Sequence, residues 1–272
     1  MYRLLARAMV ARSPVSLTGL RVLDVGAGTG AASAAVAQAG GACVALDLEP
    51  DMVVRALHLG IPSVVGDSGA LPFPASAFDA AVCAFSLSHY RRPADALAEM
   101  ARVVVGGGPV LAVGFCTETA TDPVKVAVNN VALAHGWMPP PWYRGLKDVV
   151  EPVVGRPGPL AATATAAGLI AVTVSIDRVG TGCTTPEDIV ALRLGMVHQA
   201  TWYAGLSFAE RTDVVGEAEE AVSVALAPLC RSSGWEVDLL ILSALSPMRQ
   251  ACKRRPSTRQ FDLHQKGESS DT

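Results

Sequence analysis

The chain has 272 residues, of which 50% are hydrophobic and 17% are charged, and its formal net charge is −3. This length suits one α/β domain with insertions, and the composition supplies ample material for a core. A protein that binds nucleic acid is expected to carry a broader positive footprint than this balance allows. The longest mainly apolar stretch, residues 103–115, is interrupted by three glycines and a proline, and it falls short of the ~20 residues that a spanning helix needs. We therefore expect a soluble, cytoplasmic protein with neither nucleic acid nor a membrane as its partner.

The two ends of the chain and its cysteines support this expectation. Arg3, Arg7 and Arg12 recur at near-helical spacing, which predicts an N-terminal helix over residues 1–19 rather than a secretory signal. Residues 248–272 are polar, carry a cluster of basic side chains, and are expected to form a flexible, solvated tail. None of the six cysteines belongs to a CxxC pair or has a histidine at metal-ligand spacing. The pattern fits a reducing compartment and predicts no metal site.

Strand-like and helical runs alternate through the first half of the chain. Apolar runs predict strands, and helices are expected to begin at Ala31, at Pro50, with its end at Gly60, and at Pro93. Repeated β-α-β units with almost wholly apolar strands predict a doubly wound, mostly parallel sheet covered on both faces, in the α/β class. The expected strands are residues 20–25, 42–47, 63–65, 78–85 and 109–115.

The second half of the chain follows a different rhythm. Residues 117–169 are expected to be helical around a proline-rich loop at 137–143, and residues 171–176 to form a sixth strand. Residues 184–230 are again expected to be helical, with start signals at Thr185 and in the capping-box sequence Ser207-Phe208-Ala209-Glu210. Residues 237–245 complete a seven-stranded sheet. Helical inserts are thus expected after strands five and six, within residues 117–247.

The segment Val22 to Gly30 is the most informative stretch of the sequence. A strand that turns sharply into a helix needs glycines, and the helix N-terminus then offers N–H groups to a carboxylate or phosphate. Asp47 follows at the end of the second strand, where its carboxylate can accept hydrogen bonds from both ribose hydroxyls of an adenosine. Because Gly26, Gly28 and Ala31 also satisfy the loose dinucleotide fingerprint, a nicotinamide-dependent oxidoreductase remains open, as does a tight turn without a ligand.

Five ordered motifs follow one another along the first half of the chain. They are D-x-G-x-G-x-G at 24–30, G-D-x-x-x-L-P-F at 66–73, Phe78-Asp79, the post-strand loop at 85–90, and E-x-x-R-V at 99–103 followed by three glycines. Together they resemble the motifs of class I S-adenosylmethionine-dependent methyltransferases of the small-molecule type, closely over residues 20–116 and more loosely beyond them. The family's proline-glycine pair is replaced here by Val105-Gly106, which weakens one expected turn.

The resemblance implies that S-adenosyl-L-methionine is the cofactor and S-adenosyl-L-homocysteine its product, bound in the half formed by residues 20–116. The glycine loop would hold the methionine part, Asp47 the ribose, and Phe85 would flank the sulfonium. The implied cofactor-binding residues are Asp24, Gly26, Ala27, Gly28, Gly30, Asp47, Leu48 and Met52 (either of which would pack on adenine), Asp67 and Ser68 (near its amino group), and Phe85.

The resemblance also implies methyl transfer to a small, partly hydrophobic organic acceptor, on oxygen, nitrogen or carbon, with secondary metabolism as one setting. Methyl transfer from a sulfonium depends mostly on alignment, and a general base helps only if the acceptor must lose a proton. His89 lies in the loop expected to face the methyl group and is the candidate catalytic base, with Tyr90 as a second candidate. A pocket-lining or surface role for His89 is the alternative.

The helical inserts are expected to build the acceptor pocket. Trp137, Trp142 and Tyr143 surround three prolines, as an apolar lid or as a small core of the insert. Arg193 is expected on an apolar helix face with Ile189, Met196 and Ala200, where its guanidinium needs an acceptor. This acceptor would be a structural carboxylate or an anionic group of the substrate, and His198 is expected on the exposed side of the same helix.

Two other functions stay open at this point. The first is the nicotinamide-dependent oxidoreductase. The second is a protein of methyltransferase fold that binds S-adenosylmethionine without transferring its methyl group, as a catalyst of a rearrangement or cyclisation or as a binding subunit. The sequence also leaves open whether the chain forms a homodimer.

Overall fold

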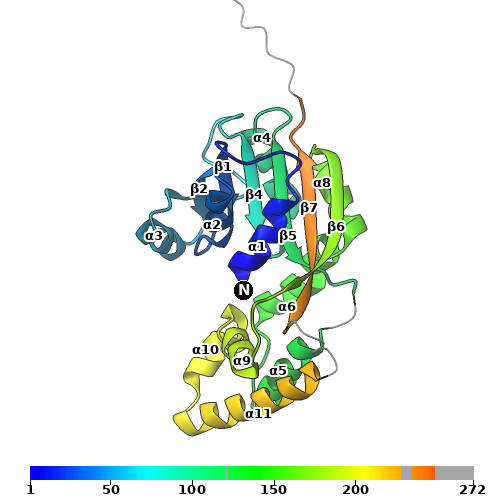
Figure 1. Cartoon of the computed structure of the whole chain (residues 1–272). Coiled ribbons are helices and arrows are strands. Elements are labelled where there is room, and N and C mark those ends of the chain that lie inside the picture. Colours follow the sequence, from blue (N-terminus) through cyan, green and yellow to red (C-terminus); the bar gives the residue numbers. More distant parts are fainter. Residues whose placement is uncertain (120–121, 228–233, 249–272) are drawn as a thin grey trace, which may run out of the picture.

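The computed structural model describes residues 1–119, 122–227 and 234–248. Its seven strands form one sheet in the order β3-β2-β1-β4-β5-β7-β6 (Figure 1). β1 to β5 pair in parallel, whereas β7 runs antiparallel to both of its neighbours, β5 and β6. The prediction of a doubly wound, mostly parallel sheet is therefore confirmed. The strands are β1 (Arg21–Val25), β2 (Ala42–Asp47), β3 (Ser63–Val65), β4 (Ala80–Ala84), β5 (Pro109–Phe115), β6 (Ile170–Gly180) and β7 (Glu236–Leu245).

Helices cover both faces of this sheet. α1 (Tyr2–Ala11) and α2 (Ala31–Gln38) pack on one face, and α4 (Pro93–Val103) and α8 (Pro157–Ala166) pack on the other. α3 (Pro50–His58) lies beside β2 and β3, and a 3-10 turn, η1 (Leu87–His89), follows β4. Proline occupies the first turn of α3 and α4, where its missing N–H costs no hydrogen bond.

The remaining helices lie where the sequence predicts inserts. Between β5 and β6 the chain forms α5 (Pro123–Ala134), α6 (Pro141–Gly145), the π-helical turn η2 (Leu146–Val150), α7 (Glu151–Val154) and α8. Between β6 and β7 it forms α9 (Pro186–Leu194), α10 (Val197–Gly205) and α11 (Phe208–Leu226). Except for α8, these helices gather below the carboxyl ends of the parallel strands (Figure 1). The predicted capping box at Ser207 and Glu210 is present at the start of α11.

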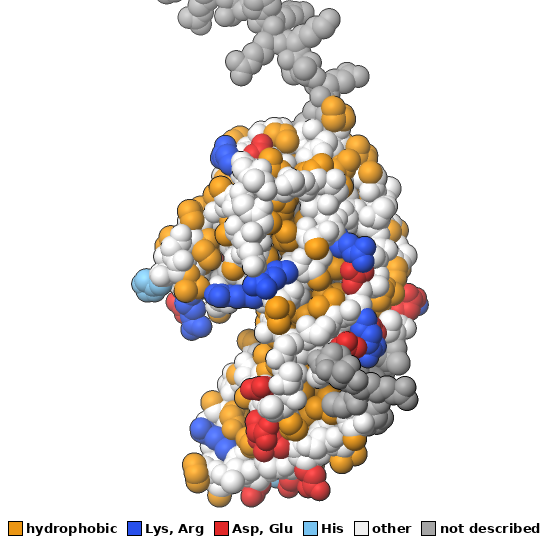
Figure 2. Space-filling view, in the orientation of Figure 1, with side chains coloured by type: hydrophobic (Ala, Val, Ile, Leu, Met, Phe, Trp, Pro, Cys, Tyr) orange, Lys and Arg blue, Asp and Glu red, His pale blue; other side chains and the backbone are white. Residues whose placement is uncertain are grey.

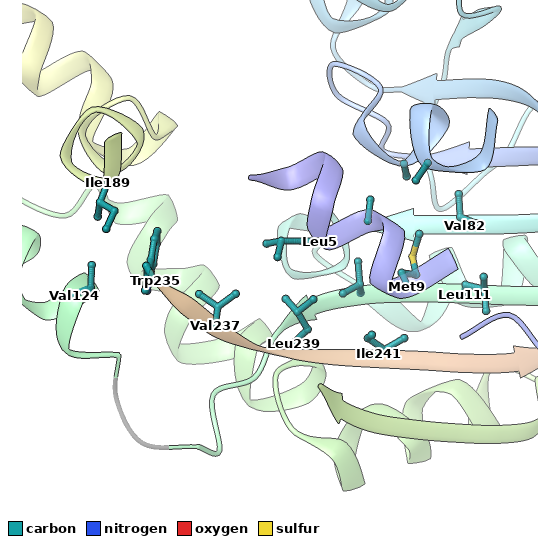
Figure 3. Close-up of a cluster of buried hydrophobic side chains, with 14 of the residues drawn as sticks. Leu5, Met9, Val82, Leu111, Val124, Ile189, Trp235, Val237, Leu239 and Ile241 are labelled. Carbon is teal, nitrogen blue, oxygen red and sulfur yellow. The ribbon is translucent and has the colours of Figure 1, made fainter. Parts of the chain in front are cut away.

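One buried cluster joins the sheet to these helices. Leu5 and Met9 of α1 pack over Leu111 of β5 and Ile241 of β7 (Figure 3). β7 begins beside the helices and runs back along this part of the sheet, and Trp235, just before it, lies against α5 and α9. The helical part is therefore anchored to the sheet through a continuous apolar core.

Several boundaries differ from the sequence prediction. β4 begins at Ala80, because Phe78 pairs only with Val104 as an isolated bridge. β6 is longer than predicted and reaches Gly180, since pairing with β7 continues past its apolar run. The helix expected to start at Thr185 and to extend past Ala200 is broken at Gly195, so α9 and α10 are separate helices.

Three other expectations concern the chain as a whole. None of the helices in the described ranges has the length and apolarity needed to cross a bilayer. No group of side chains with metal-ligand chemistry gathers among these residues. The predicted tail lies, from residue 249 on, outside the described residues, and the boundaries at residues 19, 116 and 247 stay predictions.

Candidate functional site

The glycine loop after β1 adopts a backbone that L-residues rarely take. Gly26, Gly28 and Gly30 have φ angles of +68°, +54° and +81°. Asp24 is fully buried beneath them, and its Oδ2 accepts hydrogen bonds from the backbone N–H (2.8 Å) and hydroxyl (2.7 Å) of Ser33. The Asp24 carboxylate therefore ties the end of β1 to the first turn of α2 and fixes the path of the loop.

Asp47, at the end of β2, closes the other side of this loop. Its Oδ2 accepts a hydrogen bond from the Gly28 N–H at 2.7 Å, and its Oδ1 accepts one from the Glu49 N–H at 3.0 Å. A methyl group added to Gly28 would meet no heavy atom within 4 Å, so the loop is open there. The structure thus brings Asp47 and the glycine loop together as a cradle at the carboxyl edge of the sheet.

The next motif is held by the E-x-x-R pair of α4. Arg102 donates to the carbonyls of Leu71 (3.0 Å) and Phe73 (2.8 Å), and the Leu71 N–H donates to Glu99 (2.8 Å). The Glu99 carboxylate, which bonds Arg102 at 2.6 Å and 2.7 Å, has a pKa below its usual value, chiefly because of this arginine. The E-x-x-R motif of α4 therefore holds the L-P-F segment in place through hydrogen bonds.

The residues expected around an adenine differ in exposure. Asp67 is exposed, and its Oδ1 accepts a hydrogen bond from the Gly69 N–H at 2.8 Å. Leu48 is 63% exposed, and Met52 and Ser68 are half-buried. These side chains are accessible at the sheet edge, and their contact with a cofactor stays a prediction.

Phe85 directly follows β4 and has a positive φ of +59°, a conformation that is uncommon for a bulky residue and concentrates at functional sites. Its ring lies 5.0 Å from the ring of Tyr2 and 5.0 Å from that of Phe115. The first turn of α1 therefore reaches the same strand ends as the glycine loop.

Tyr90 is packed beneath the glycine loop. Its hydroxyl donates to Ser86 Oγ at 3.0 Å, and the Ser86 hydroxyl donates to the Val25 carbonyl at 3.0 Å. Burial raises the pKa of Tyr90 well above its usual value. A methyl group added to Gly26 would lie 2.2 Å from the Tyr90 oxygen and 2.6 Å from Ser86 Oγ. The hydroxyl is thus engaged in positioning the loop.

His89 lies one residue earlier, in η1, with an exposed side chain. The surrounding protein lowers its pKa, first through partial desolvation and then through the positive charge of Lys147, while Glu151 opposes the shift. η1 packs against η2 and α7, which carry these two residues. The ring therefore lies where the sheet meets the first helical insert and is poised to be neutral near pH 7.

The aromatic residues of the first insert contact one another, since the Tyr143 ring lies 6.4 Å from that of Trp137 and 5.8 Å from that of Trp142, but they differ in burial. Trp137 is buried, and its indole N–H donates to the carbonyl of His198 at 2.9 Å, whereas Trp142 is 47% exposed. The Tyr143 ring stacks on His198 at 4.2 Å with an interplanar angle of 8°. The expectation that His198 is exposed was wrong, because α10 turns its ring toward this stack. Burial, then Arg193 and other cations, lowers the pKa of His198 to about 4.

Arg193 is buried, as its apolar neighbours predict, with 5% of its surface exposed. Its Nη2 donates to Asn129 Oδ1 at 3.0 Å, and its Nη1 lies 3.1 Å from the Met196 sulfur. Among the residues that the structure describes it forms no ion pair, so the expected structural carboxylate is not there. The shared helix face was also wrong, since Met196 and Ala200 lie beyond the break at Gly195.

The surface between these groups is concave. Figure 2 shows a hollow on one side of the molecule, between the part that carries α3 and the part that carries α10, with Lys and Arg side chains over α1 at its rim. A small cavity of about 40 Å³ lies nearby and is lined by Phe85, Ser88, Phe115 and Glu151, among others. The strand ends thus border space on the side of the helical inserts.

Sequence reasoning missed several residues of this region. Tyr2, Ser86, Lys125 and Asn129 all contact or electrostatically influence the expected site residues. Asn129 was detectable in principle, because Asn129-Asn130 interrupts an otherwise apolar helical run. Nothing in the local sequence distinguishes Tyr2.

A glycine loop after β1, a carboxylate after β2 and a sheet of this order together define a Rossmann-like protein of the class I methyltransferase type. Residues 23–112 match the family model described as "Methyltransferase domain". Over this range the chain is therefore similar to methyltransferase domains, and its sheet has the fold of the class I methyltransferases.

One curated relative matches part of the chain, and two solved structures share its fold. A demethylmenaquinone methyltransferase of Renibacterium salmoninarum is 40% identical over 115 residues, which are 42% of this chain and 48% of that protein. The chain thus matches about half the length of that relative. A phosphoethanolamine N-methyltransferase of Haemonchus contortus in complex with S-adenosyl-L-methionine shares the fold (TM-score 0.53, 18% identity, 90% of this chain and 52% of that one). So does the (4+2)-cyclase SpnF (TM-score 0.54, 21% identity, 91% and 81%).

Proposed function

We propose that this protein transfers a methyl group from S-adenosyl-L-methionine to a small, partly hydrophobic organic acceptor. The observation that carries the proposal is the convergence of the D-x-G-x-G-x-G loop, Asp47 and the Asp67 segment at one sheet edge, within the residues that match the methyltransferase-domain model. The match to the Renibacterium relative covers too little of either chain to carry over its acceptor.

The residues present fit this cofactor. Gly28 leaves open space in the cradle, and the Asp47 carboxylate retains free lone pairs beside its two backbone hydrogen bonds. Asp24 Oδ1 is a buried oxygen without a hydrogen-bond partner among the described residues, which favours a positively charged ligand group nearby. When bound, the cofactor supplies an electrophilic methyl group on a sulfonium whose leaving group is already activated.

The chain's own residues would then act mainly by alignment. Asp24 and Tyr90 fix the loop, Asp47 holds the ribose, and Phe85 with Tyr2 forms the apolar wall beside the methyl group. His89 takes a proton from the acceptor where the acceptor must lose one. Because the Tyr90 hydroxyl is buried and bonded to Ser86, we assign Tyr90 a positioning role.

Binding and labelling experiments test this function. We expect S-adenosylmethionine and S-adenosylhomocysteine to bind the full-length chain in calorimetry, and NADH not to bind. Transfer of labelled methyl to members of a panel of small phenols, amines and acids would then support methyl transfer. Binding of NADH without a response to S-adenosylhomocysteine would refute the proposal. Tight binding of S-adenosylmethionine with no label transfer, but conversion of an added acceptor, would favour a non-methylating reaction.

A further inference from the structure

The helical inserts enclose a group of cations with too few anions to balance them. Arg193 of α9, Lys125 of α5 and Lys147 of η2 lie within electrostatic reach of one another. Glu151 is ion-paired with Lys147. The other carboxylate in range, Asp122, caps α5 through the N–H groups of its first turn and accepts the Trp235 indole N–H at 3.1 Å. Glu151 is therefore engaged by Lys147 and Asp122 by α5 and Trp235, and within the described residues Arg193 and Lys125 form no ion pair.

Arg193 is the centre of this group. Its only hydrogen bonds within the described ranges go to a neutral amide and a thioether, and its Nε has no partner. A buried guanidinium is costly unless acceptors satisfy its donors, and it recognises planar oxyanions through paired N–H groups. The arginine thus lacks the partner that its burial requires.

The groups around Arg193 are also incompletely bonded. Gln199 donates to Asn129 Oδ1 at 3.1 Å, but its own carbonyl oxygen has no partner, and neither has Nε2 of the His198 ring, within the described part of the chain. Buried polar groups are almost always hydrogen-bonded, and each exception calls for an explanation. A ligand with acceptor oxygens would satisfy the Arg193 Nε–H and, in the Nε2–H tautomer, the His198 ring, whereas Gln199 Oε1 is itself an acceptor and needs a donor.

This cluster adjoins the proposed reaction centre. Tyr2, whose ring contacts Phe85, lies within electrostatic reach of Arg193. His89 lies within reach of Lys147 and of His198. A ligand held by Arg193 would therefore extend toward the strand ends that the cofactor is expected to occupy.

We propose that Arg193 and Lys125 bind an oxyanion, a carboxylate or phosphate group, of the methyl acceptor, so that the acceptor is a small organic acid with an apolar body. The apolar body would lie along Tyr143 and the wall formed by Phe85 and Tyr2. That the bound ligand is the methyl acceptor rests on the proposed function. The oxyanion site itself can be tested separately.

The test uses benzoate and phenyl phosphate as charged probes and benzamide as their uncharged counterpart. Each is titrated into the full-length chain with and without saturating S-adenosylhomocysteine, by calorimetry and by thermal shift. We expect at least one charged probe to bind ~10-fold or more tightly than benzamide, since a charge-assisted bidentate contact is lost with the amide. The stronger of the two charged probes identifies the group as carboxylate or phosphate.

Substitutions test whether Arg193 and Lys125 form the oxyanion site. Arg193→Met should remove the preference for the charged probe, and Lys125→Met, at a less buried position, should weaken it without loss of fold. Arg211→Met is the matched control, because in the described part of the chain this half-buried guanidinium donates its hydrogen bonds to the carbonyls of Leu206 and Ala204, and it lies outside the cluster. Equal binding of all three probes, or an unchanged preference in both test variants, would overturn the proposal.

The parent protein provides an independent measurement. Burial, then the charge of Lys147, lowers the pKa of Lys125 to about 8, with Glu151 opposing and Arg193 adding to the shift. Binding of the charged probe should therefore weaken as the pH rises through about 8, and binding of benzamide should not change. An affinity for benzoate that is flat from pH 6 to pH 9.5 would exclude Lys125 from the site. Failure of S-adenosylhomocysteine to bind, with the probe preference intact, would refute only the proposed function.

Discussion

Substitutions in the glycine loop separate its structural role from its binding role. Gly26 and Gly28 both have positive φ angles, +68° and +54°, so an alanine at either position carries the cost of a left-handed backbone, roughly 1–2 kcal/mol. Only at Gly26 would the new methyl group collide, at 2.2 Å from the Tyr90 oxygen and 2.6 Å from Ser86 Oγ. Overpacking of this kind adds roughly 1–3 kcal/mol.

We therefore expect Gly26→Ala to lower the free energy of unfolding by roughly 2–5 kcal/mol and Gly28→Ala by roughly 1–2 kcal/mol. The effects on cofactor affinity should have the opposite order, so that Gly28→Ala weakens cofactor binding more than Gly26→Ala does. The methyl group of Gly28→Ala would project into the open side of the cradle, where it blocks a ligand and disturbs nothing else. Urea unfolding followed by circular dichroism measures stability, and calorimetry with S-adenosylhomocysteine measures binding.

A double-mutant cycle identifies the cause of the collision. Tyr90→Phe removes the hydroxyl nearest to the added methyl group, at the cost of its hydrogen bond to Ser86, about 0.5–1.5 kcal/mol. In the Gly26→Ala background the same change should cost less or even stabilise, with a coupling of roughly 0.5–3 kcal/mol. If Gly26→Ala proves no less stable than Gly28→Ala, or if the two changes simply add, the packing of Tyr90 against the loop is not what requires glycine.

Three further predictions concern single carboxylates and His89. Asp47→Ala should weaken S-adenosylhomocysteine binding by roughly 1–3 kcal/mol in a folded protein, as calorimetry would show, and unchanged affinity would place the ribose elsewhere. His89→Ala should lower methyl-transfer turnover by ~10²–10⁴ with cofactor affinity intact, and the parent rate should rise with pH through a midpoint below ~6.5, because the pKa of His89 is lowered. Near-parental turnover would remove His89 from the mechanism. Burial raises the pKa of Asp24 to about 6, so the folded protein binds a proton at this carboxyl more tightly than the unfolded chain does. The stability of the parent protein should therefore fall as the pH rises from 4 to 6. Asp24→Asn should lack this fall, which amounts to at most roughly 3 kcal/mol, and parallel pH profiles of urea unfolding would contradict the assignment.

Most of the fold was predictable because its signals are local. β2, β3 and β5 begin and end where the apolar runs do, and α3 and α4 begin at the prolines that mark them. The end of β6 was not predictable in this way. Its last residues, from Asp177 to Gly180, are held by the β7 ladder and by the ion pairs of Arg178 with Glu236 and Asp238, partners almost sixty residues away.

The cofactor side of the site was predictable for a similar reason. Asp24, Gly26, Gly28 and Gly30 lie in one short segment, and Asp47 lies at the next strand end, where the parallel sheet must bring it alongside. The role of Tyr90 was not predictable. Its function as a support depends on a contact with Gly26 that only the packing of η1 under the loop creates.

On the acceptor side, the sequence predicted the burial of Arg193 but not its hydrogen-bond partners. The apolar neighbours on α9 sufficed to predict a buried guanidinium, yet the partner they demanded was expected to be a carboxylate. Asn129, which takes that place, comes from a helix 64 residues earlier in the chain, and Lys125 lies one turn before it. A buried arginine that meets an amide instead of a carboxylate keeps its full charge, whereas a structural ion pair would have neutralised it. The absence of an ion pair at Arg193 in the described residues is therefore the feature on which the proposed selection of an anionic acceptor rests.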